Sequence, residues 1–125
     1  MTAPVGQTAS IRPVRPRDAA SLIIIDRSGS EPRFLLGKRH EKHKFMPGKY
    51  VFPGGKTDAC DRKVIPARDI DPGCLQRLHA GLDRRGTEAK ARALALSAVR
   101  EAFEEAGVLI GQASDFETVH AEWLP

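Results

Sequence analysis

Three glutamates lie close together within the most strongly helical segment of the chain. Glu101, Glu104 and Glu105 fall within five residues of the otherwise apolar stretch SAVREAFEEAGVLIG, residues 97–111. At about 100° per residue, an α-helix places these carboxylates on one face about 100° wide. Arg100 is the only lysine or arginine after position 92, so few cations balance the cluster. The cluster is therefore either a solvated acidic face or a site that receives a cation.

The surroundings of the glutamates favour a cation. The last turn of a helix already disfavours anions, and a solvated acidic face usually carries lysines four residues away. Mg²⁺ is a hard cation that prefers oxygen ligands and would remove the repulsion. We expect the glutamates to be presented away from the packing face of the helix, which the following residues would form: Ala95, Val99, Ala102, Phe103 and Ala106.

A second segment, YVFPGGK at residues 50–56, looks like a short strand that ends in Pro-Gly-Gly. Glycines at the end of a strand let the backbone turn tightly and approach a ligand closely. Alone, this segment is also compatible with an ordinary turn.

Taken together, the two segments resemble the signature of the Nudix hydrolase family. That signature has the form Gly-x5-Glu-x7-Arg-Glu-U-x-Glu-Glu-x-Gly-U, in which U is apolar. Gly55 would open its first half, and residues 100–108 fill its second half. Counted back from Arg100, the first glutamate of the signature falls on Arg92, so the number of metal ions stays open. The long spacer indicates an insertion at about residues 56–86, similar to those of coenzyme A or nucleotide-sugar diphosphatases.

The resemblance implies an α/β (α+β) fold, an α/β/α sandwich around a mixed β-sheet. It also implies hydrolysis of the diphosphate bond in a nucleoside diphosphate linked to a nucleotide, a sugar or coenzyme A. Mg²⁺ or Mn²⁺ would be bound by Glu101, Glu104, Glu105 and a backbone carbonyl at Gly55. Glu101, Glu104 and Arg100 would be catalytic, with one glutamate as the base and Arg100 orienting a glutamate or holding a phosphate. The alternative is a Nudix-like domain that binds a nucleotide and regulates without hydrolysis.

The charge distribution constrains the partner. The first fifty residues carry ten Lys/Arg against four Asp/Glu, whereas residues 93–125 carry one against six. No basic stripe interleaved with aromatics accompanies this charge, so we expect a phosphorylated small molecule and no nucleic acid. Arg39, Lys49 and Lys56 would bind this substrate, although a solvated basic loop at residues 40–49 is the alternative. Asp58 and Asp61 would either cap turns or support the metal indirectly.

The remaining features predict the organisation of the domain. No apolar run approaches the roughly 20 residues needed to span a bilayer, so we expect no membrane partner. Two cysteines are too few for a disulfide framework and indicate free thiols of a cytoplasmic protein. Few residues follow Gly111, so the chain would be the N-terminal portion of a longer protein, or a partner copy in a homodimer would complete the sheet. The expected segments are a flexible arm (1–18) and a Nudix-like domain (19–125) that contains a buried strand (19–26), its hairpin partner (33–39), a short strand (50–52), a short helix (72–82), a long helix (87–107) and a last strand (108–110).

Overall fold

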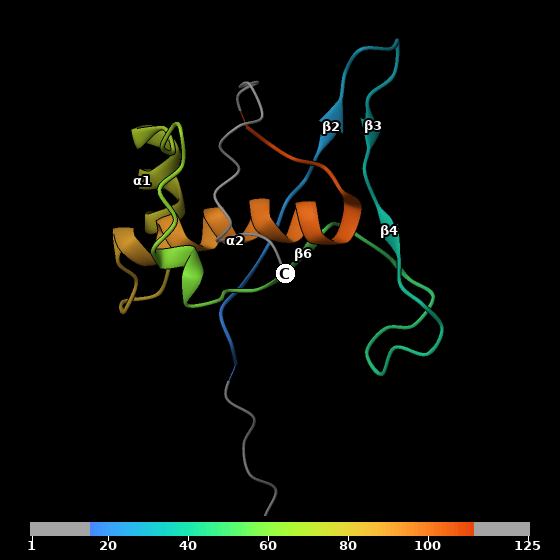
Figure 1. The fold of residues 1–125 in the computed structure, drawn as a ribbon, viewed down its shortest axis with the longest axis horizontal. Helices are drawn as coiled ribbons and strands as arrows, with labels where there is room; N and C mark the ends of the chain where they lie inside the picture. The colour runs from blue at the N-terminus through green and yellow to red at the C-terminus, as the bar shows by residue number, and fades with distance from the viewer. Residues whose placement is uncertain (1–15, 112–125) are drawn as a thin grey trace, which may run out of the picture.

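The structure is a computed structural model, and it describes residues 16–111 of the 125-residue chain (Figure 1). Most of the expected N-terminal arm, and everything after Gly111, lies outside the described residues. Short strands alternate with loops in the first half, and helices follow in the second half. In chain order the elements are β1 (Ala19–Ser21), β2 (Ile25–Asp26), β3 (Arg33–Phe34), β4 (Gly37–Lys38), β5 (Tyr50–Val51), β6 (Gly54–Lys56), the 3-10 helix η1 (Cys60–Arg62), α1 (Pro72–Ala80) and α2 (Glu88–Ala106).

The described strands form three antiparallel pairs. They are β1 with β6, β2 with β3, and β4 with β5. In the first pair, Ala20 lies opposite Gly55 and Ser21 lies opposite Gly54. Helix α2 packs against this pair, and also against η1 and α1 (Figure 1). Helices combined with small antiparallel sheets confirm the α+β class, and the pairs found between residues 16 and 111 are all antiparallel.

Local signals explain both α-helices. The Thr87 hydroxyl accepts a hydrogen bond from Lys90 N at 3.1 Å, which caps the start of α2. Gly107 ends it in the left-handed conformation, with φ of 67°, and its N–H donates to Phe103 O. Pro72 occupies the first turn of α1, and Asp71 caps it. These caps confirm the long helix and the short helix that the sequence predicts.

Three strand predictions are wrong in detail because strands depend on distant partners. The segment 19–26 is not one buried strand: β1 and β2 pair with different strands, and Ile23 between them is 56% exposed. β4 pairs with β5 and does not extend the β2–β3 hairpin. Residues 108–110 are irregular, since no described strand pairs with them.

Within the Pro-Gly-Gly segment, the two glycines form a strand and not a turn, and Pro53 lies in the bend before them. Gly54 and Gly55 belong to β6, and neither has a positive φ. Their lack of a Cβ atom serves a different purpose. A Cβ at Gly54 would lie less than 3.0 Å from the backbone of Ala20 and Ser21, so glycine permits the close pairing with β1.

The prediction for the packing face of α2 is only partly correct, because Ala102 is buried as expected but Arg100 is buried as well. Arg100 is buried on the face that turns toward β6 and η1, and the Glu101 side chain is only 16% exposed. Ala106, which was expected to pack, is exposed. The small buried residues around Arg100 let the helix approach its neighbours closely, and hydrogen bonds satisfy the buried polar groups. The buried residues of α2 are Ala91, Ala93, Ser97, Ala98, Arg100 and Ala102.

Two general expectations can be compared with the structure. Cys60 and Cys74 are free thiols, as predicted. Among the helices of residues 16–111, none combines the length and the apolar character needed to cross a membrane.

Candidate functional site

The guanidinium of Arg100 lies at the centre of the candidate site. Its Nε donates to Asp61 Oδ1 at 2.8 Å, and its Nη2 donates to Asp61 Oδ2 at 3.1 Å and to the Lys56 carbonyl at 3.0 Å. Its Nη1 donates to Glu101 Oε1 at 3.0 Å and to Glu104 Oε2 at 2.9 Å. A guanidinium has five N–H groups, and these five bonds use all of them. One side chain therefore connects β6, η1 and two of the three glutamates.

The bond between Arg100 and Asp61 is a buried ion pair. Asp61 has no exposed surface, and Arg100 is 8% exposed. Hydrogen bonding to Asp61, followed by bonding to Glu104, raises the pKa of Arg100 above its already high ordinary value, despite the opposing effect of burial. Arg100 is therefore a permanent cation, and it partly neutralises the acidic cluster.

The two glycines of β6, Gly54 and Gly55, lie next to Glu105 and Glu101 respectively. Gly54 N donates to Glu105 Oε2 at 3.0 Å. A Cβ at Gly55 would lie less than 3.0 Å from all three atoms of the Glu101 carboxylate. Glycine at this position therefore leaves the space that the Glu101 side chain occupies. Glu101 and Glu105 thus lie beside this strand, and Glu104 is the most exposed of the carboxylates bonded to Arg100, at 44%.

The chemistry of these side chains fits a hard divalent cation. In the part of the chain that the structure describes, no three His, Cys, Asp or Glu side chains are close enough to form a ready metal-ligand group. However, each glutamate keeps one oxygen outside the hydrogen bonds found among the described residues: Glu101 Oε2, Glu104 Oε1 and Glu105 Oε1. Oxygen-only ligands of this kind suit Mg²⁺ and Mn²⁺.

Asp61 is the site residue whose importance the sequence analysis underestimated. Five residues separate Gly55 from Asp61, so the forward count of the signature places an acid, Asp61, where the family pattern has glutamate. Counting back from Arg100 led to Arg92 instead. The bond from Arg100 to Asp61 indicates that the forward count is correct and that the insertion begins after Asp61. A forward count from the glycine was the signal that could have found it.

Arg92 is the residue that the count back from Arg100 places at the first glutamate of the signature. Its side chain bonds to Asp69 and to Val64 O. Its Nε donates to both carboxylate oxygens of Asp69, at 3.0 and 3.1 Å, and its Nη2 donates to Val64 O at 3.2 Å. Arg92 therefore attaches the segment after η1 to α2.

Asp58, just before η1, and Asp61, within η1, both support this turn. Asp58 Oδ1 accepts from Cys60 N at 3.2 Å, and its own N–H donates to Asp61 Oδ2 at 2.7 Å. Hydrogen bonds from the backbone of Cys60 and Ala59 lower the pKa of Asp58. Partial burial, together with the negative charges of Asp61 and Asp58, raises the pKa of the Cys60 thiol. Asp58 thus shapes the turn, whereas Asp61 both shapes it and holds Arg100.

The structure separates the three expected substrate-binding residues. Lys56 lies in β6 beside Gly55, and its side chain is exposed while its carbonyl binds Arg100. Arg39 and Lys49 lie in the loop between β4 and β5, where the Arg39 guanidinium donates to Phe45 O and stacks on the Phe45 ring. Among the described residues, neither Arg39 nor Lys49 bonds to a glutamate of the cluster.

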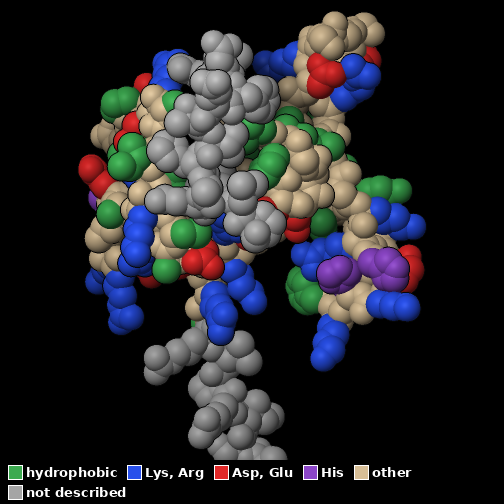
Figure 2. Space-filling view, viewed as in Figure 1, with side chains coloured by type: hydrophobic (Ala, Val, Ile, Leu, Met, Phe, Trp, Pro, Cys, Tyr) green, Lys and Arg blue, Asp and Glu red, His purple; other side chains and the backbone are tan. Residues whose placement is uncertain are grey.

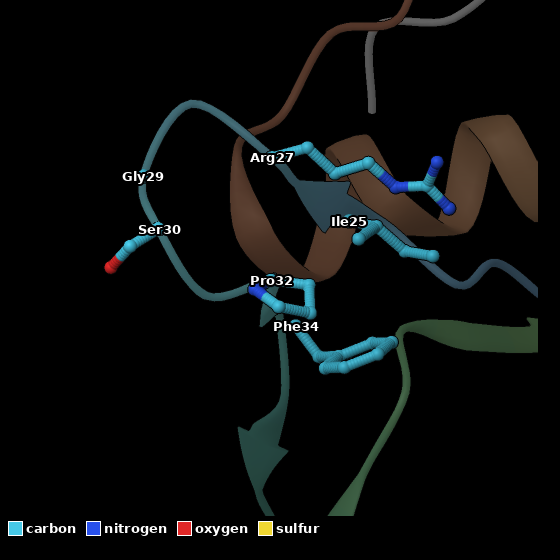
Figure 3. Close-up of a pocket in the computed structure, with 6 residues that line it drawn as sticks. All are labelled: Ile25, Arg27, Gly29, Ser30, Pro32 and Phe34. Carbon is cyan, nitrogen blue, oxygen red and sulfur yellow. The ribbon is translucent and has the colours of Figure 1, made fainter.

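A hollow of about 340 Å³ lies elsewhere, against the β2–β3 hairpin. In Figure 3, Ile25 and Phe34 project to the same side of the hairpin, while Ser30 points away. None of its lining residues belongs to the acidic cluster, so we assign it no role in the candidate site. The lining residues are Ile25, Arg27, Gly29, Ser30, Pro32 and Phe34.

Comparisons with known proteins find relatives of one kind. No family model matches the chain. The human acyl-coenzyme A diphosphatase NUDT19 is 36% identical over 98 residues, which cover 62% of this chain and 26% of that protein. The acyl-coenzyme A diphosphatase NUDT19 of Xenopus laevis is 31% identical over 106 residues, which cover 71% of this chain and 28% of that protein.

A solved structure agrees with these relatives. The crystal structure of a NUDIX hydrolase from Alicyclobacillus acidocaldarius superposes with a TM-score of 0.52 at 29% identity. The match covers 75% of this chain and 38% of that one. The chain therefore spans about a quarter of the length of the two curated relatives and little more than a third of the solved structure.

Proposed function

The chain belongs to the Nudix hydrolase family, and from this membership we propose that it carries the catalytic helix of a metal-dependent diphosphate hydrolase. The reaction would be attack of water on the diphosphate bond of a nucleoside diphosphate linked to another group. The observation that carries the proposal is the Arg100 network. It fixes Glu101 and Glu104, and Gly55 of β6 leaves room for the Glu101 carboxylate.

In this proposal each residue of the cluster has a defined task. Glu101, Glu104, Glu105 and the carbonyl of Gly55 hold Mg²⁺ or Mn²⁺, and either Glu101 or Glu104 accepts the proton of the attacking water. A divalent cation bound there supplies charge neutralisation of the diphosphate and a lower pKa for the water. Arg100 orients the glutamates. It does not hold a substrate phosphate, because all five of its N–H groups are already engaged.

The names of the relatives suggest the substrate class. Both are acyl-coenzyme A diphosphatases, and coenzyme A contains a diphosphate between a nucleoside and another moiety. We propose a coenzyme A type of substrate, with the exposed Lys56 side chain as the best placed of the expected phosphate contacts. Arg39 and Lys49 would contribute only if the substrate extends to the β4–β5 loop. A cytoplasmic location and pairing with a second copy stay predictions from the sequence.

The test is release of product from a panel of nucleoside diphosphate derivatives, with and without Mg²⁺ or Mn²⁺. Glu104→Gln and Glu105→Gln keep the size of the side chain and remove its charge, so each should lower kcat/KM by about a hundredfold or more. Glu88→Gln, in the first turn of the same helix, is the matched control and should retain activity. Variants as active as the wild type would exclude the glutamate cluster as the metal site. Tight nucleotide binding without turnover would favour a regulatory domain.

A further inference from the structure

The loop between β4 and β5, residues 39–49, projects from the rest of the described residues, on the side of the molecule away from α1 (Figure 1). Together with Lys38 it carries five Lys/Arg and one Asp/Glu. Figure 2 shows blue and purple side chains gathered there, with little red among them, and the histidines of the loop are His40 and His43. The basic residues are Lys38, Arg39, Lys42, Lys44 and Lys49.

Two apolar side chains lie at the end of this basic loop. Phe45 is 69% exposed, and Met46 is 49% exposed. Large apolar side chains exposed side by side on a projecting loop are a mark of an interaction surface. Lys44 precedes them and Lys49 follows shortly after, so the apolar tip is flanked by positive charge.

The loop is braced, so its tip is held in place. Arg39 Nη1 donates to Phe45 O at 3.1 Å, and the guanidinium lies 5.7 Å from the centre of the Phe45 ring. The backbone of Arg39 also bonds to Lys49 O and to Gly48 N across the base of the loop. Met46 adopts φ of 48°, which is uncommon for a residue other than glycine. These contacts present Phe45 and Met46 to solvent in a defined conformation.

We propose that the β4–β5 loop docks the protein on anionic phospholipid surfaces. Lysines predominate over arginine there, and the single arginine is engaged within the loop, so the charges act as separate points and not as bidentate forks. Separate positive charges around an apolar tip match an anionic headgroup layer above an acyl boundary. The loop projects from the molecule, whereas small-molecule ligands usually bind in concave sites.

This docking needs no membrane-spanning segment. The expectation of no membrane partner was based on the missing span, and surface binding by a charged, apolar-tipped segment is a separate mode. The proposal also does not rest on hydrolysis, since its test contains neither metal nor substrate.

The experiment is co-sedimentation of the full chain with phosphatidylcholine vesicles that contain or lack phosphatidylserine. We expect binding only to the phosphatidylserine vesicles, and its loss at about 0.5 M NaCl, where charges are screened. Phe45→Ser with Met46→Asn removes the apolar tip, and asparagine tolerates the left-handed conformation of Met46. Lys42→Glu with Lys44→Glu reverses two charges. Each pair should weaken binding about tenfold or more.

A matched control separates the loop from the total charge of the chain. Arg62→Glu with Arg85→Glu makes the same change in net charge away from the loop, at a hollow beside the start of α2. This variant should bind vesicles like the wild type. Far-UV circular dichroism checks that each variant is folded. Loop variants that bind like the wild type, or equal binding to neutral vesicles, would overturn the proposal. It would equally be overturned if polyglutamate or DNA bound through the loop while phosphatidylserine vesicles did not.

Discussion

Arg100 is held by five hydrogen bonds, and this changes the part it can play in catalysis. The sequence analysis left two roles open, a phosphate contact or an orienting residue. Because Asp61, Glu101, Glu104 and the Lys56 carbonyl use every N–H group, the geometry favours the orienting role. The buried carboxylate of Asp61 in turn depends on Arg100 for its neutralisation.

We therefore predict that Arg100→Lys destabilises the protein strongly even though it conserves the charge. Lysine is a point charge with three donors and cannot bond to both oxygens of Asp61 and to two glutamates at once. Leaving a buried carboxylate partly unpaired should lower the free energy of unfolding by about 3 kcal/mol, measured by urea denaturation.

Arg33→Lys is the control for this experiment. Arg33 pairs with Asp26 at 2.6 Å, but the two side chains are 71% and 47% exposed. An exposed pair of this kind contributes little to stability, so this substitution should leave the free energy of unfolding nearly unchanged. Equal losses from the two substitutions would show that the buried network contributes little to stability.

A second prediction concerns the space beside Gly55. In Gly55→Ala, the new Cβ would overlap the end of the Glu101 side chain, which can rotate away without moving the backbone. We expect a folded protein whose affinity for Mn²⁺ is lower by about tenfold or more, since ligand orientation is lost. Titration followed by water proton relaxation measures this affinity. Gly37→Ala, where no atom lies within 4 Å, should bind Mn²⁺ like the wild type. An unchanged affinity in Gly55→Ala would contradict the placement of Glu101 in the site.

The helix and strand that position the site were predicted with unequal success. The long helix α2 was predicted correctly because Thr87 and Gly107 act within a few residues of its ends. Its packing face was predicted only in part, since Arg100 is buried by Asp61, 39 positions earlier, and periodicity within a helix does not contain that partner. The Pro-Gly-Gly strand was mistaken for a turn for the same reason, because its pairing with β1 involves residues more than thirty positions away. The residue types of the candidate site were visible in the sequence, but the connection between them was not.

Arg92 attaches the segment after η1 to α2 through its bonds to Asp69 and Val64 O, which we call the clamp. We expect the loss of these bonds to affect only that segment. In Arg92→Ala the bonds to Asp69 and to Val64 O are lost. Because Arg92 and Asp69 are partly exposed, the free energy of unfolding should fall only slightly. Residues 64–69 should nevertheless open more often, and trypsin should cleave faster at Lys63 and Arg68. Arg84→Ala is the control, and similar cleavage rates in both variants would contradict the clamp.

The clamp should also depend on pH. A hydrogen bond from Ile70 N, followed by that from Arg92, lowers the pKa of Asp69 in the folded protein. A lowered folded-state pKa means that the stabilisation is present above the ordinary aspartate pKa of about 4 and is lost as the pH falls through the lower value. The cleavage rates of Arg92→Ala and the wild type should therefore converge in acid. This comparison needs an acid-active protease such as pepsin.

At the scale of the whole molecule, positive and negative charge are segregated. The chain carries a net charge of +4, yet its last 33 residues contain six of the 16 acidic residues and one of the 20 basic ones. Arg100 neutralises only part of the cluster on α2, so Glu101, Glu104 and Glu105 keep an unbalanced negative charge close to β6. A bound divalent cation would favour the folded state, because the unfolded chain does not hold the glutamates together.

We therefore predict that Mg²⁺ stabilises the whole chain against unfolding. At a concentration about ten times its Kd, Mg²⁺ should add about 1.4 kcal/mol to the free energy of unfolding, which raises Tm by several degrees in a thermal melt. NaCl must be added to the metal-free sample to match its ionic strength, since a charged chain responds to salt in general. Glu101→Gln with Glu105→Gln should abolish the shift, and Glu88→Gln should preserve it. If the double variant is stabilised as much as the wild type, Mg²⁺ binds elsewhere, and the carboxylates on α2 are only a charged surface that Arg100 and β6 hold in place.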